Sequence, residues 1–385
     1  MEPKIFARTI DPAAQEQIKK MSQCEAYKDC EICIMPDVHA GKGCTVGTVI
    51  KIKDKIVPNT VGVDIGCGMT VLGLGKIHID LQKLDEVINT KIPSGFASHD
   101  EPIVRYPWLC NLHCARSIKV DYAMRQIGTL GGGNHFIEID QDSSGYKYLV
   151  IHSGSRNLGV QVCNYYQSRA KESDEMRDIR REIIDRLKSE GREKEIAAEL
   201  AKVKKARCEK ELAYIDGELM KQYLDDMEIV QIYASLNRGI MAKIICDSMG
   251  WSINERFETI HNYIDIESGI LRKGAVRASK GEMLIIPINM RDGSFLCYGK
   301  GNDEWLQSAP HGAGRVMSRS EARKNLSMDD YKREMQNVYS TSVCEDTIDE
   351  APMAYKSKLE IFTCIRPTVT VMDTIKPIYN FKAKN

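Results

Sequence analysis

At residues 55–75 the chain reads KIVPNTVGVDIGCGMTVLGLG, in which short aliphatic runs alternate with glycines. Apolar runs of this length between glycine turns are typical of strands in a tightly turned sheet. The same pattern precedes it in GCTVGTVIKI and returns beyond residue 260 in GEMLIIPINM, GSFLCYGKGN and TVTVMDTI. We therefore expect a mainly β region at about 30–155 and further strands after residue 260.

The stretch between these regions, at about 161–249, has a different character. It is charged and poor in glycine, and its apolar residues recur at spacings of three and four, which predicts two or three amphipathic helices that could form a projecting hairpin. We favour a solvated helix face over a dedicated binding arm as the reason for its charges. The predicted fold class is α+β: a single large domain, residues 1–385, with mixed β-sheets around a central metal and nucleotide cleft and a helical insertion at about 161–249.

Composition limits the class of protein. The chain has 385 residues, 43% of them hydrophobic, without an apolar run of about 18 residues, so we expect a globular protein with no membrane partner. The N-terminus lacks the pattern of a secretion signal, and 13 cysteines without a framework spacing favour reduced thiols, so we predict a cytoplasmic protein. Lys plus Arg and Asp plus Glu are 54 each, so binding of nucleic acid would need a local basic patch.

Histidines concentrate in glycine-rich strings. Of eight histidines, five lie in MPDVHAGKG, GGGNHFIEI, IHSGSRNLG, HNY and APHGAGRVMSR. A structural zinc site would place its Cys and His ligands two to five residues apart, whereas these candidate ligands are separated by tens of residues. A catalytic metal centre assembled by the fold is the better interpretation. The pairs in CEIC and CNLHC are weaker signals, which we attribute to packing.

In VGVDIGCGM, Asp64 and Cys67 are three residues apart, and the flanking glycines allow the backbone to turn so that both side chains point the same way. Oxygen, sulfur and imidazole together suit Mn, Fe, Co or Zn, while Mg and Ca prefer oxygen alone. A tight turn with a buried cysteine is the alternative. Because its sulfur would be a metal-held thiolate, Cys67 is expected to become vulnerable to oxidation when metal is lost.

His135 and His152 stand beside several glycines, whose exposed N–H groups can cradle phosphate, and Arg156 can add a bidentate contact. Asn134 and Glu138 could read a purine edge or orient the imidazole of His135. A hydrogen-bonded structural role is the alternative for any single histidine of this kind. The candidate basic patch comprises Arg156, Lys273, Arg277, Arg315 and Arg319.

The string HGAGR, residues 311–315, indicates a different role. Imidazole forms phosphoramidates, so His311 could attack a phosphorus atom while the arginines stabilise the developing charge; the alternative is a further metal ligand. GxxxxGK[ST] does not occur, which excludes an ordinary P-loop, and GKGCTVG does not match a dinucleotide fingerprint.

Taken together, MPDVHAGKG, GVDIGCGM, GGGNHFIE, HSGSR, HNY, RKGA, HGAGRVMSR and DEAPMAYK resemble the RtcB-type 3′-phosphate RNA-splicing ligases over nearly the whole chain. The resemblance implies two Mn²⁺ ions bridged by the cysteine. It assigns one ion to Asp64, Cys67 and His135, and the other to Cys67, His152 and His261. It also implies that His311 takes GMP from GTP.

The implied reaction joins an RNA 3′-phosphate, or a 2′,3′-cyclic phosphate after hydrolysis, to a 5′-hydroxyl, in RNA repair or tRNA splicing. GMP passes from His311 to the RNA 3′-phosphate and leaves when the 5′-hydroxyl attacks. RNA and GTP are the implied partners, and an activating protein is a further candidate. The implied nucleotide contacts are Asn134, Phe136, Glu138, Asn289, Ser294, His311, Gly312, Ala313, Gly314, Tyr355 and Lys382; the implied RNA or phosphate contacts are Arg156, Lys273, Arg315 and Arg319.

Two departures from the family pattern suggest a divergent branch. Where the family has IPGSMG, this chain has IPINMRDG, with Ile288 and Asn289 in place of glycine and serine. Asn289 can still donate a hydrogen bond, whereas Ile288 lacks the backbone freedom of glycine. The chain also ends in FKAKN, so it continues for three residues past Lys382. Competing readings are a binuclear metal-dependent phosphohydrolase acting on RNA ends, which would turn over without GTP, and a metal-stabilised RNA-binding module without activity.

Overall fold

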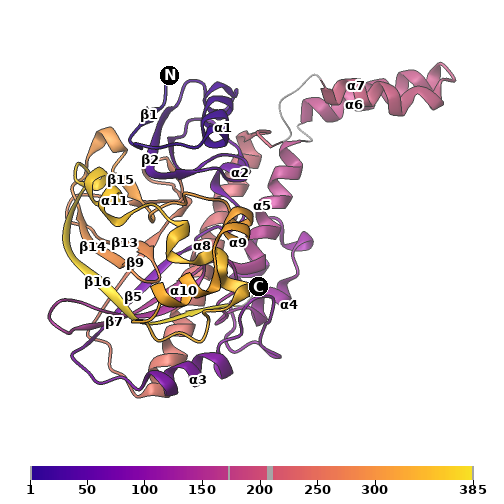
Figure 1. Ribbon diagram of the computed structural model, residues 1–385. Coiled ribbons are helices and arrows are strands. Elements are labelled where there is room, and N and C mark those ends of the chain that lie inside the picture. Colours follow the sequence, from indigo (N-terminus) through magenta and orange to yellow (C-terminus); the bar gives the residue numbers. More distant parts are fainter. Residues whose placement is uncertain (1, 172–173, 206–210, 384–385) are drawn as a thin grey trace.

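The computed structural model describes residues 2–171, 174–205 and 211–383 (Figure 1). It confirms the predicted α+β class. Strands form two large sheets and two small ones, and helices lie around them. No helix in the described ranges is long and apolar enough to cross a membrane.

The larger sheet has seven strands in the order β13-β14-β16-β6-β7-β5-β9, and every neighbouring pair is antiparallel. Its strands are β5 (Gly68–Gly75), β6 (Phe136–Gln141), β7 (Lys147–Ser153), β9 (Glu255–Ile260), β13 (Met283–Asn289), β14 (Gly293–Gly299) and β16 (Val369–Lys382). Strand β5 contains the MTVLGLG run, and all of its residues are buried, because β7 and β9 pair with its two edges and its side chains lie in two hydrophobic core clusters.

A second sheet of five strands has the order β1-β2-β3-β11-β10. Its strands are β1 (Lys4–Ile5), β2 (Glu31–His39), β3 (Val46–Lys51), β10 (Asn262–Asp265) and β11 (Ile270–Lys273). Two small sheets pair β12 (Ala275–Arg277) with β15 (Ser308–Pro310) and β4 (Lys55–Ile56) with β8 (Ile215–Asp216). The strands expected at 30–155 and beyond 260 are therefore present.

The longest helix, α8 (Gly217–Met249), is part of the core although it falls within the predicted insertion. It packs on β5 and β7, and its Arg238 is fully buried. Nη1 of Arg238 donates to the carbonyl oxygens of Gly66 and Ser153 at 2.9 Å each. Helix α8 thus fixes the backbone beside Cys67 and His152. Helix α5 (Arg156–Ala170) packs against α8 as well.

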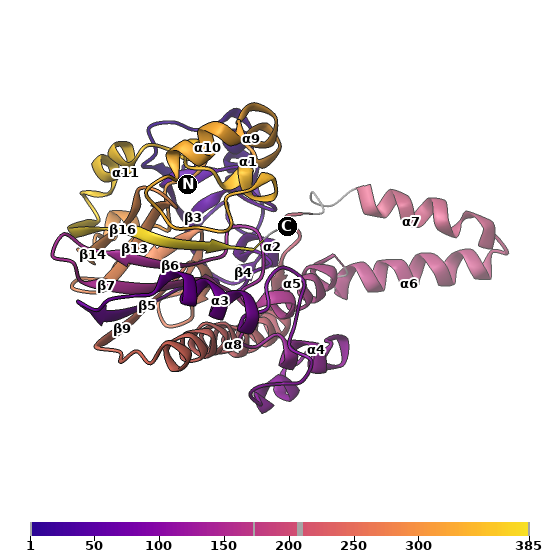
Figure 2. The same ribbon diagram turned by 60° about the horizontal axis from the view of Figure 1, so that its bottom comes forward.

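Only the middle of the 161–249 stretch projects. Helices α6 (Asp174–Ser189) and α7 (Ile196–Lys205) run side by side away from the sheets, as Figures 1 and 2 both show. At the base of this hairpin, Nε2 of Gln167 donates to the carbonyl oxygen of Ala213 at 3.1 Å, so the two ends lie close together. The organisation of residues 1–385 as a single domain stays a prediction, for which a test is given below.

The remaining helices interrupt the strand regions, including the one predicted as mainly β. Helix α3 begins at the N-cap Asp80 and buries Leu84, Val87 and Ile88 on one face, so its 3.6-residue period departs from the strand pattern before it. The α-helices not yet named are α1 (Pro12–Gln23), α2 (Pro58–Val61), α3 (Leu81–Lys91), α4 (Val120–Arg125), α9 (Arg319–Asn325), α10 (Met328–Glu334) and α11 (Lys358–Ile365). The 3₁₀ helices are η1 (Pro107–Asn111), η2 (Ala115–Ser117), η3 (Glu193–Glu195), η4 (Asp303–Trp305), η5 (Glu345–Glu350) and η6 (Pro352–Ala354).

Candidate metal and nucleotide site

The seven-stranded sheet brings the predicted metal ligands to one edge. Cys67 precedes β5 and His135 precedes β6, whereas His152 ends β7 and His261 follows β9. Because neighbouring strands run antiparallel, the starts of β5 and β6 lie beside the ends of β7 and β9. The register confirms this: Met69 and Phe136 both pair with His152, and Gly68 pairs with Ile260.

At this edge the side chains form two clusters that share one cysteine. Cys67, His152 and His261 form the first, and Asp64, Cys67 and His135 the second, with the ligand atoms of each cluster all within 4.8 Å of one another. Sγ of Cys67 lies 3.4 Å from Nε2 of His152 and 3.5 Å from Nε2 of His135. Oδ2 of Asp64 lies 3.0 Å from Nε2 of His135.

The outer nitrogens of two histidines are held by the backbone. Nδ1 of His135 donates to the carbonyl oxygen of Leu130 at 2.9 Å, and Nδ1 of His152 donates to that of Asn134 at 3.2 Å. Because a carbonyl can only accept, the hydrogens lie on Nδ1 and the Nε2 lone pairs point inward. The lone pair of His135 there faces Sγ of Cys67 and the carboxylate of Asp64. That of His152 faces Sγ of Cys67 and, at 3.3 Å, Nε2 of His261. Acceptors that face one another fit a site built for cations, and this mixed donor set suits Mn or Zn better than Mg.

Burial keeps these ligands in the form that binds metal, with one exception. It lowers the pKa of His152 and His261 well below the usual range, so both imidazoles are neutral. Burial opposes ionisation of Asp64, but its hydrogen bonds and nearby positive charge, including that of Arg156, outweigh it and lower that pKa to about 2. The exception is Cys67, because burial raises the pKa of its thiol, and a thiolate there requires a neighbouring cation.

His311 stands next to this edge, directly after β15. Its ring packs on that of His261 with centroids 4.7 Å apart. Nδ1 of His311 lies 2.7 Å from Oδ2 of Asp37, a fully buried residue of β2. The carboxylate fixes the hydrogen on Nδ1 and leaves Nε2 free to attack, as the aspartate of a hydrolase triad does. Asp37 was not predicted from the sequence, in which its only signal is its place in MPDVHAGKG.

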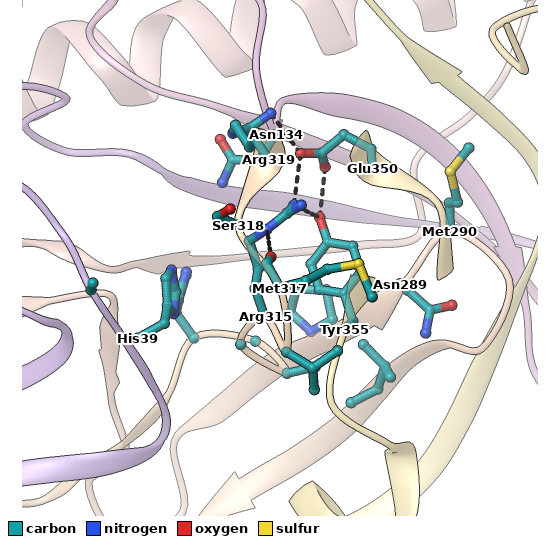
Figure 3. A pocket seen from close by; sticks show the side chains of 18 of the residues that line it. His39, Asn134, Asn289, Met290, Arg315, Met317, Ser318, Arg319, Glu350 and Tyr355 are labelled. Atoms are coloured by element: carbon teal, nitrogen blue, oxygen red, sulfur yellow. Dashed lines mark hydrogen bonds and ion pairs between the residues drawn. The ribbon is translucent and has the colours of Figure 1, made fainter. Parts of the chain in front are cut away.

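A cavity of about 810 Å³ opens beside His311 (Figure 3). Its walls include most of the predicted nucleotide contacts: Asn134, Phe136, Glu138, Asn289, His311, Gly312, Ala313, Gly314, Tyr355 and Lys382. Ser294, also predicted, lies in β14 opposite Pro287 with a fully buried side chain. Burial raises the pKa of Glu138 to about 7, against the opposing effects of its hydrogen bond from Asn380 and the charge of Lys382.

Glu350, which sequence reasoning did not identify, organises one wall of this cavity. Its carboxylate accepts hydrogen bonds from the Tyr355 hydroxyl at 2.7 Å and from Nζ of Lys382 at 2.8 Å. Nη1 of Arg319 lies 2.9 Å and that of Arg315 3.4 Å from the same carboxylate (Figure 3). Burial opposes the charge of Glu350, but Lys382 and Arg319 lower its pKa to about 2. Arg315, Arg319 and Lys382 thus gather around the buried carboxylate of Glu350 on this wall.

A second cavity, of about 240 Å³, lies on the metal side of His311. Lys42, Asp64, Cys67, His261 and Lys273 are in its lining. Nζ of Lys273 donates to the carbonyl oxygen of Asn59 at 3.2 Å and to that of Lys42.

Arg156, predicted as a phosphate contact, supports the glycine turn at 131–133. Its Nη2 donates to the carbonyl oxygen of Gly95 at 3.0 Å, and its Nε donates to the Thr129 hydroxyl at 3.3 Å. A Cβ at Gly131 would stand 1.9 Å from the guanidinium, so only glycine allows this contact.

The divergent IPINMRDG loop forms a compact turn. Oδ1 of Asn289 accepts from the backbone N–H of Arg291 at 3.0 Å and of Asp292 at 2.8 Å. Its Nδ2 donates to Asp292 at 2.9 Å, and Ile288 is buried in the hydrophobic core. Side-chain hydrogen bonds of Asn289 thus close this turn, whereas the family pattern has a glycine, whose backbone is freer, in the same loop.

Packing accounts for both cysteines of CEIC but for only one cysteine of CNLHC. In CEIC, Cys30 and Cys33 are buried, and their thiols donate to the carbonyl oxygens of Ala26 and Glu304. In CNLHC, Cys110 is exposed and Cys114 is buried. Among the described residues neither pair belongs to a cluster of potential ligands, and every described cysteine is a free thiol.

Comparison with known proteins agrees with this geometry. The family model described as "tRNA-splicing ligase RtcB" matches residues 17–107 and 110–383. The RNA-splicing ligase RtcB of Escherichia coli K12 is 34% identical over 391 aligned residues, which cover 90% of this chain and 88% of the relative. The tRNA-splicing ligase RtcB of Archaeoglobus fulgidus is 27% identical and covers 84% of this chain and 81% of its own. The chain therefore belongs to the RtcB family of RNA-splicing ligases.

Proposed function

We propose that this RNA ligase joins RNA 3′-phosphate or 2′,3′-cyclic phosphate ends to 5′-hydroxyl ends through a GMP adduct of His311, with GTP and two Mn²⁺ ions. Joining of 3′-phosphate to 5′-hydroxyl ends is the activity of its family. The observation that carries the proposal is the position of His311. It is held by Asp37 at the junction of the nucleotide cavity and the metal-side cavity.

In the first step Nε2 of His311 attacks the α-phosphorus of GTP. The N–P bond forms, the bond from the α-phosphorus to the β-phosphate breaks, and pyrophosphate leaves with the electron pair. Asp37 keeps the hydrogen on Nδ1, and its charge stabilises the positive ring that develops. An RNA 3′-phosphate oxygen then attacks the same phosphorus and displaces His311, so that GMP is attached to the RNA end.

The two clusters around Cys67 provide the proposed metal sites, with Asp64, Cys67 and His135 for one ion and Cys67, His152 and His261 for the other. When bound there, Mn²⁺ would neutralise phosphate charge and polarise phosphoryl oxygens beside His311. The backbone carbonyls that hold His135 and His152 keep these ligands aimed at the ions.

Guanine recognition is proposed for the deep end of the nucleotide cavity. Guanine offers N–H donors on its Watson–Crick edge, which match the ionised carboxylate of Glu138. Phe136 and Tyr355 supply aromatic surface. Lys382, near both Glu138 and Glu350, is proposed as a further contact, and Ser294 remains a predicted one. Phosphate charge would be met by Arg315 and Arg319 on the cavity wall and by Lys273 on the metal side.

A sealing assay tests this function. RNA halves with 3′-phosphate and 5′-hydroxyl ends are incubated with the protein and Mn²⁺, with and without GTP. The expected result is joined RNA only with GTP, and none with His311→Ala. His113 lies on the surface beside Asp225 with a side chain 43% exposed, so His113→Ala serves as the control and should seal normally. If the RNA loses its terminal phosphate without GTP and is not joined when GTP is present, the phosphohydrolase alternative is favoured.

A further inference from the structure

Asp37 holds two imidazoles. Its carboxylate accepts from Nδ1 of His311 at 2.7 Å, and its backbone carbonyl accepts from Nδ1 of His39 at 2.9 Å. The carbonyl requires a hydrogen on Nδ1 of His39, so Nε2 keeps its lone pair in the neutral ring. Burial lowers the pKa of His39 and outweighs the opposing effects of its hydrogen bond to the Asp37 carbonyl and of the Asp37 charge. His39 is therefore an imidazole in the form that can accept a proton.

His39 lies where the two cavities meet. The residues common to their linings are His39, Asn134 and His311. Figure 3 shows His39 on the wall of the nucleotide cavity, separate from the group formed by Arg315, Tyr355 and Glu350. Whatever reacts next to His311 is therefore within the space that His39 borders.

The other titratable groups lining the metal-side cavity have other tasks. Asp64, Cys67 and His261 belong to the metal clusters, and His311 carries GMP in the proposed reaction. Nζ of Lys273 donates to two backbone carbonyl oxygens, and Lys42 and Lys273 are basic side chains suited to binding phosphate. Of the described groups lining this cavity, His39 is the one left to act as a base.

We propose that Nε2 of His39 is the general base that takes the proton from the RNA 5′-hydroxyl in the sealing step. The proposal rests on the proposed function, because it presupposes an RNA 3′-phosphate activated with GMP. In-line displacement places the attacking oxygen opposite the leaving group. With GMP in the nucleotide cavity, the 5′-hydroxyl enters from the metal-side cavity, which His39 borders.

At the activated RNA end, one bond to phosphorus forms and another breaks. The 5′-oxygen forms a bond to the phosphorus of the 3′-phosphate while its proton moves to Nε2 of His39. The bond from that phosphorus to the oxygen bridging to GMP breaks, and GMP leaves with the electron pair. His39 then returns the proton to solvent.

The groups around His39 are the Asp37 carboxylate on β2, His311 after β15, Arg315 beyond it, and Asp11 and Lys42 in the flanking cavity walls.

The test separates the two halves of the reaction. His39→Gln and His39→Ala are compared with wild type and with the control His113→Gln. Labelling of His311 by α-labelled GTP reports the first step. Sealing of RNA that already carries GMP on its 3′-phosphate reports the last. The expected result is labelling within about twofold of wild type and sealing slower by roughly 10²–10⁴-fold, the range of general base catalysis. Equal losses in both steps, or normal sealing, would overturn the proposal.

A chemical substitution in the RNA gives a readout that a structural role would not move. A 5′-thiol ionises with a pKa of about 8.5, as a cysteine thiol does, so its attack needs little help from a base. His39→Gln should therefore seal activated RNA with a 5′-thiol at nearly the wild-type rate. The wild-type rate with a 5′-hydroxyl should rise with pH at the acidic end, and the variant should lose this rise. An equal deficit with both nucleophiles would show that His39 does not act as a base.

A failure of the proposed function looks different. If wild-type protein neither labels His311 nor seals RNA that carries GMP, the ligase mechanism itself is wrong. If wild type does both and His39→Gln matches it throughout, only the role of His39 is wrong.

Discussion

Oδ2 of Asp37 lies 2.7 Å from Nδ1 of His311, although the two residues are 274 positions apart in the chain. Asp37 is fully buried on β2, and His311 follows β15, which contacts β2. A buried carboxylate that fixes an imidazole tautomer this way commonly activates the opposite nitrogen of the ring.

Asp37→Asn should therefore slow labelling of His311 by α-labelled GTP by roughly 10²–10⁴-fold, by analogy with the aspartate of the serine protease triad. The amide keeps the shape of the side chain but loses the charge that stabilises the positive ring. The measurement is the rate of adduct formation at saturating GTP. Asp29 is exposed, so Asp29→Asn is a matched control that should label normally. A wild-type rate for Asp37→Asn would remove this role.

Cys67 belongs to both ligand clusters, so Cys67→Ser should lower the Mn²⁺ content for both ions. By contrast, Asp64→Ala and His261→Ala should each lower it for one ion only. We expect the affinity of Cys67→Ser for Mn²⁺ to fall by at least about tenfold, because losing even a group that only hydrogen-bonds to a metal ligand typically lowers metal affinity by this much. Metal analysis after dialysis against graded Mn²⁺ measures the effect independently of activity.

Cys110, an exposed cysteine, provides the control, and Cys110→Ser should bind metal like the wild type. Undiminished Mn²⁺ content in Cys67→Ser would contradict the bridging position of Cys67.

GTP binding should strengthen as pH rises through about 7, the pKa to which burial raises Glu138. The sign follows from the chemistry, since the ionised carboxylate present above this pKa accepts guanine N–H groups and the protonated acid below it accepts them poorly. If only the ionised form binds, the apparent affinity rises about tenfold between pH 6 and pH 8. Calorimetry with GTP on metal-loaded protein measures this.

Glu138→Gln should bind GTP weakly at every pH and lose this dependence. A pH-dependent affinity that persists in Glu138→Gln would assign the titration to another group.

The hairpin of α6 and α7 should be dispensable for chemistry at His311. Gln167 and Ala213 hold its base closed, so a short glycine and serine linker can replace residues 172–210. We expect the shortened chain to fold and to label with GTP within about threefold of wild type, because the described parts of α6 and α7 contact mainly each other and η3, and such segments add little to the stability of the rest of a protein. Thermal unfolding and the labelling rate are the measurements. Failure to fold would contradict the proposed single domain with a projecting hairpin.

The sequence predicted the metal ligands better than the groups that hold them. Asp64, Cys67, His135, His152 and His261 lie in glycine-rich strings whose composition is rare enough to be informative. Their convergence depends on the antiparallel strand order, which no local pattern reveals.

Asp37 and Glu350 could not be found in this way. Each is a single carboxylate, and its role depends on a partner far away in the chain, such as His311 or Lys382. Surface carboxylates have the same local sequence signature as buried ones.

Helix α8 was predicted as part of an insertion because charged residues surround it. Its charged positions include Arg238, which is buried and hydrogen-bonded to backbone carbonyls. From the sequence alone, a buried arginine of this kind is predicted to lie on the surface, because the carbonyl oxygens that accept its hydrogen bonds are not known. Likewise, the sequence around Arg156 does not reveal that its guanidinium lies against Gly131 and donates to Gly95; its role as a phosphate contact stays a prediction.

The most direct test of the central claim is covalent labelling of His311. Purified protein is incubated with Mn²⁺ and α-labelled GTP, resolved on a denaturing gel, and then supplied with RNA halves that bear 3′-phosphate and 5′-hydroxyl ends. The proposed ligase mechanism predicts an acid-labile adduct that is absent from His311→Ala and disappears as the RNA is sealed. An adduct of equal yield in His311→Ala, or sealed RNA from a protein that never acquires label, would contradict it.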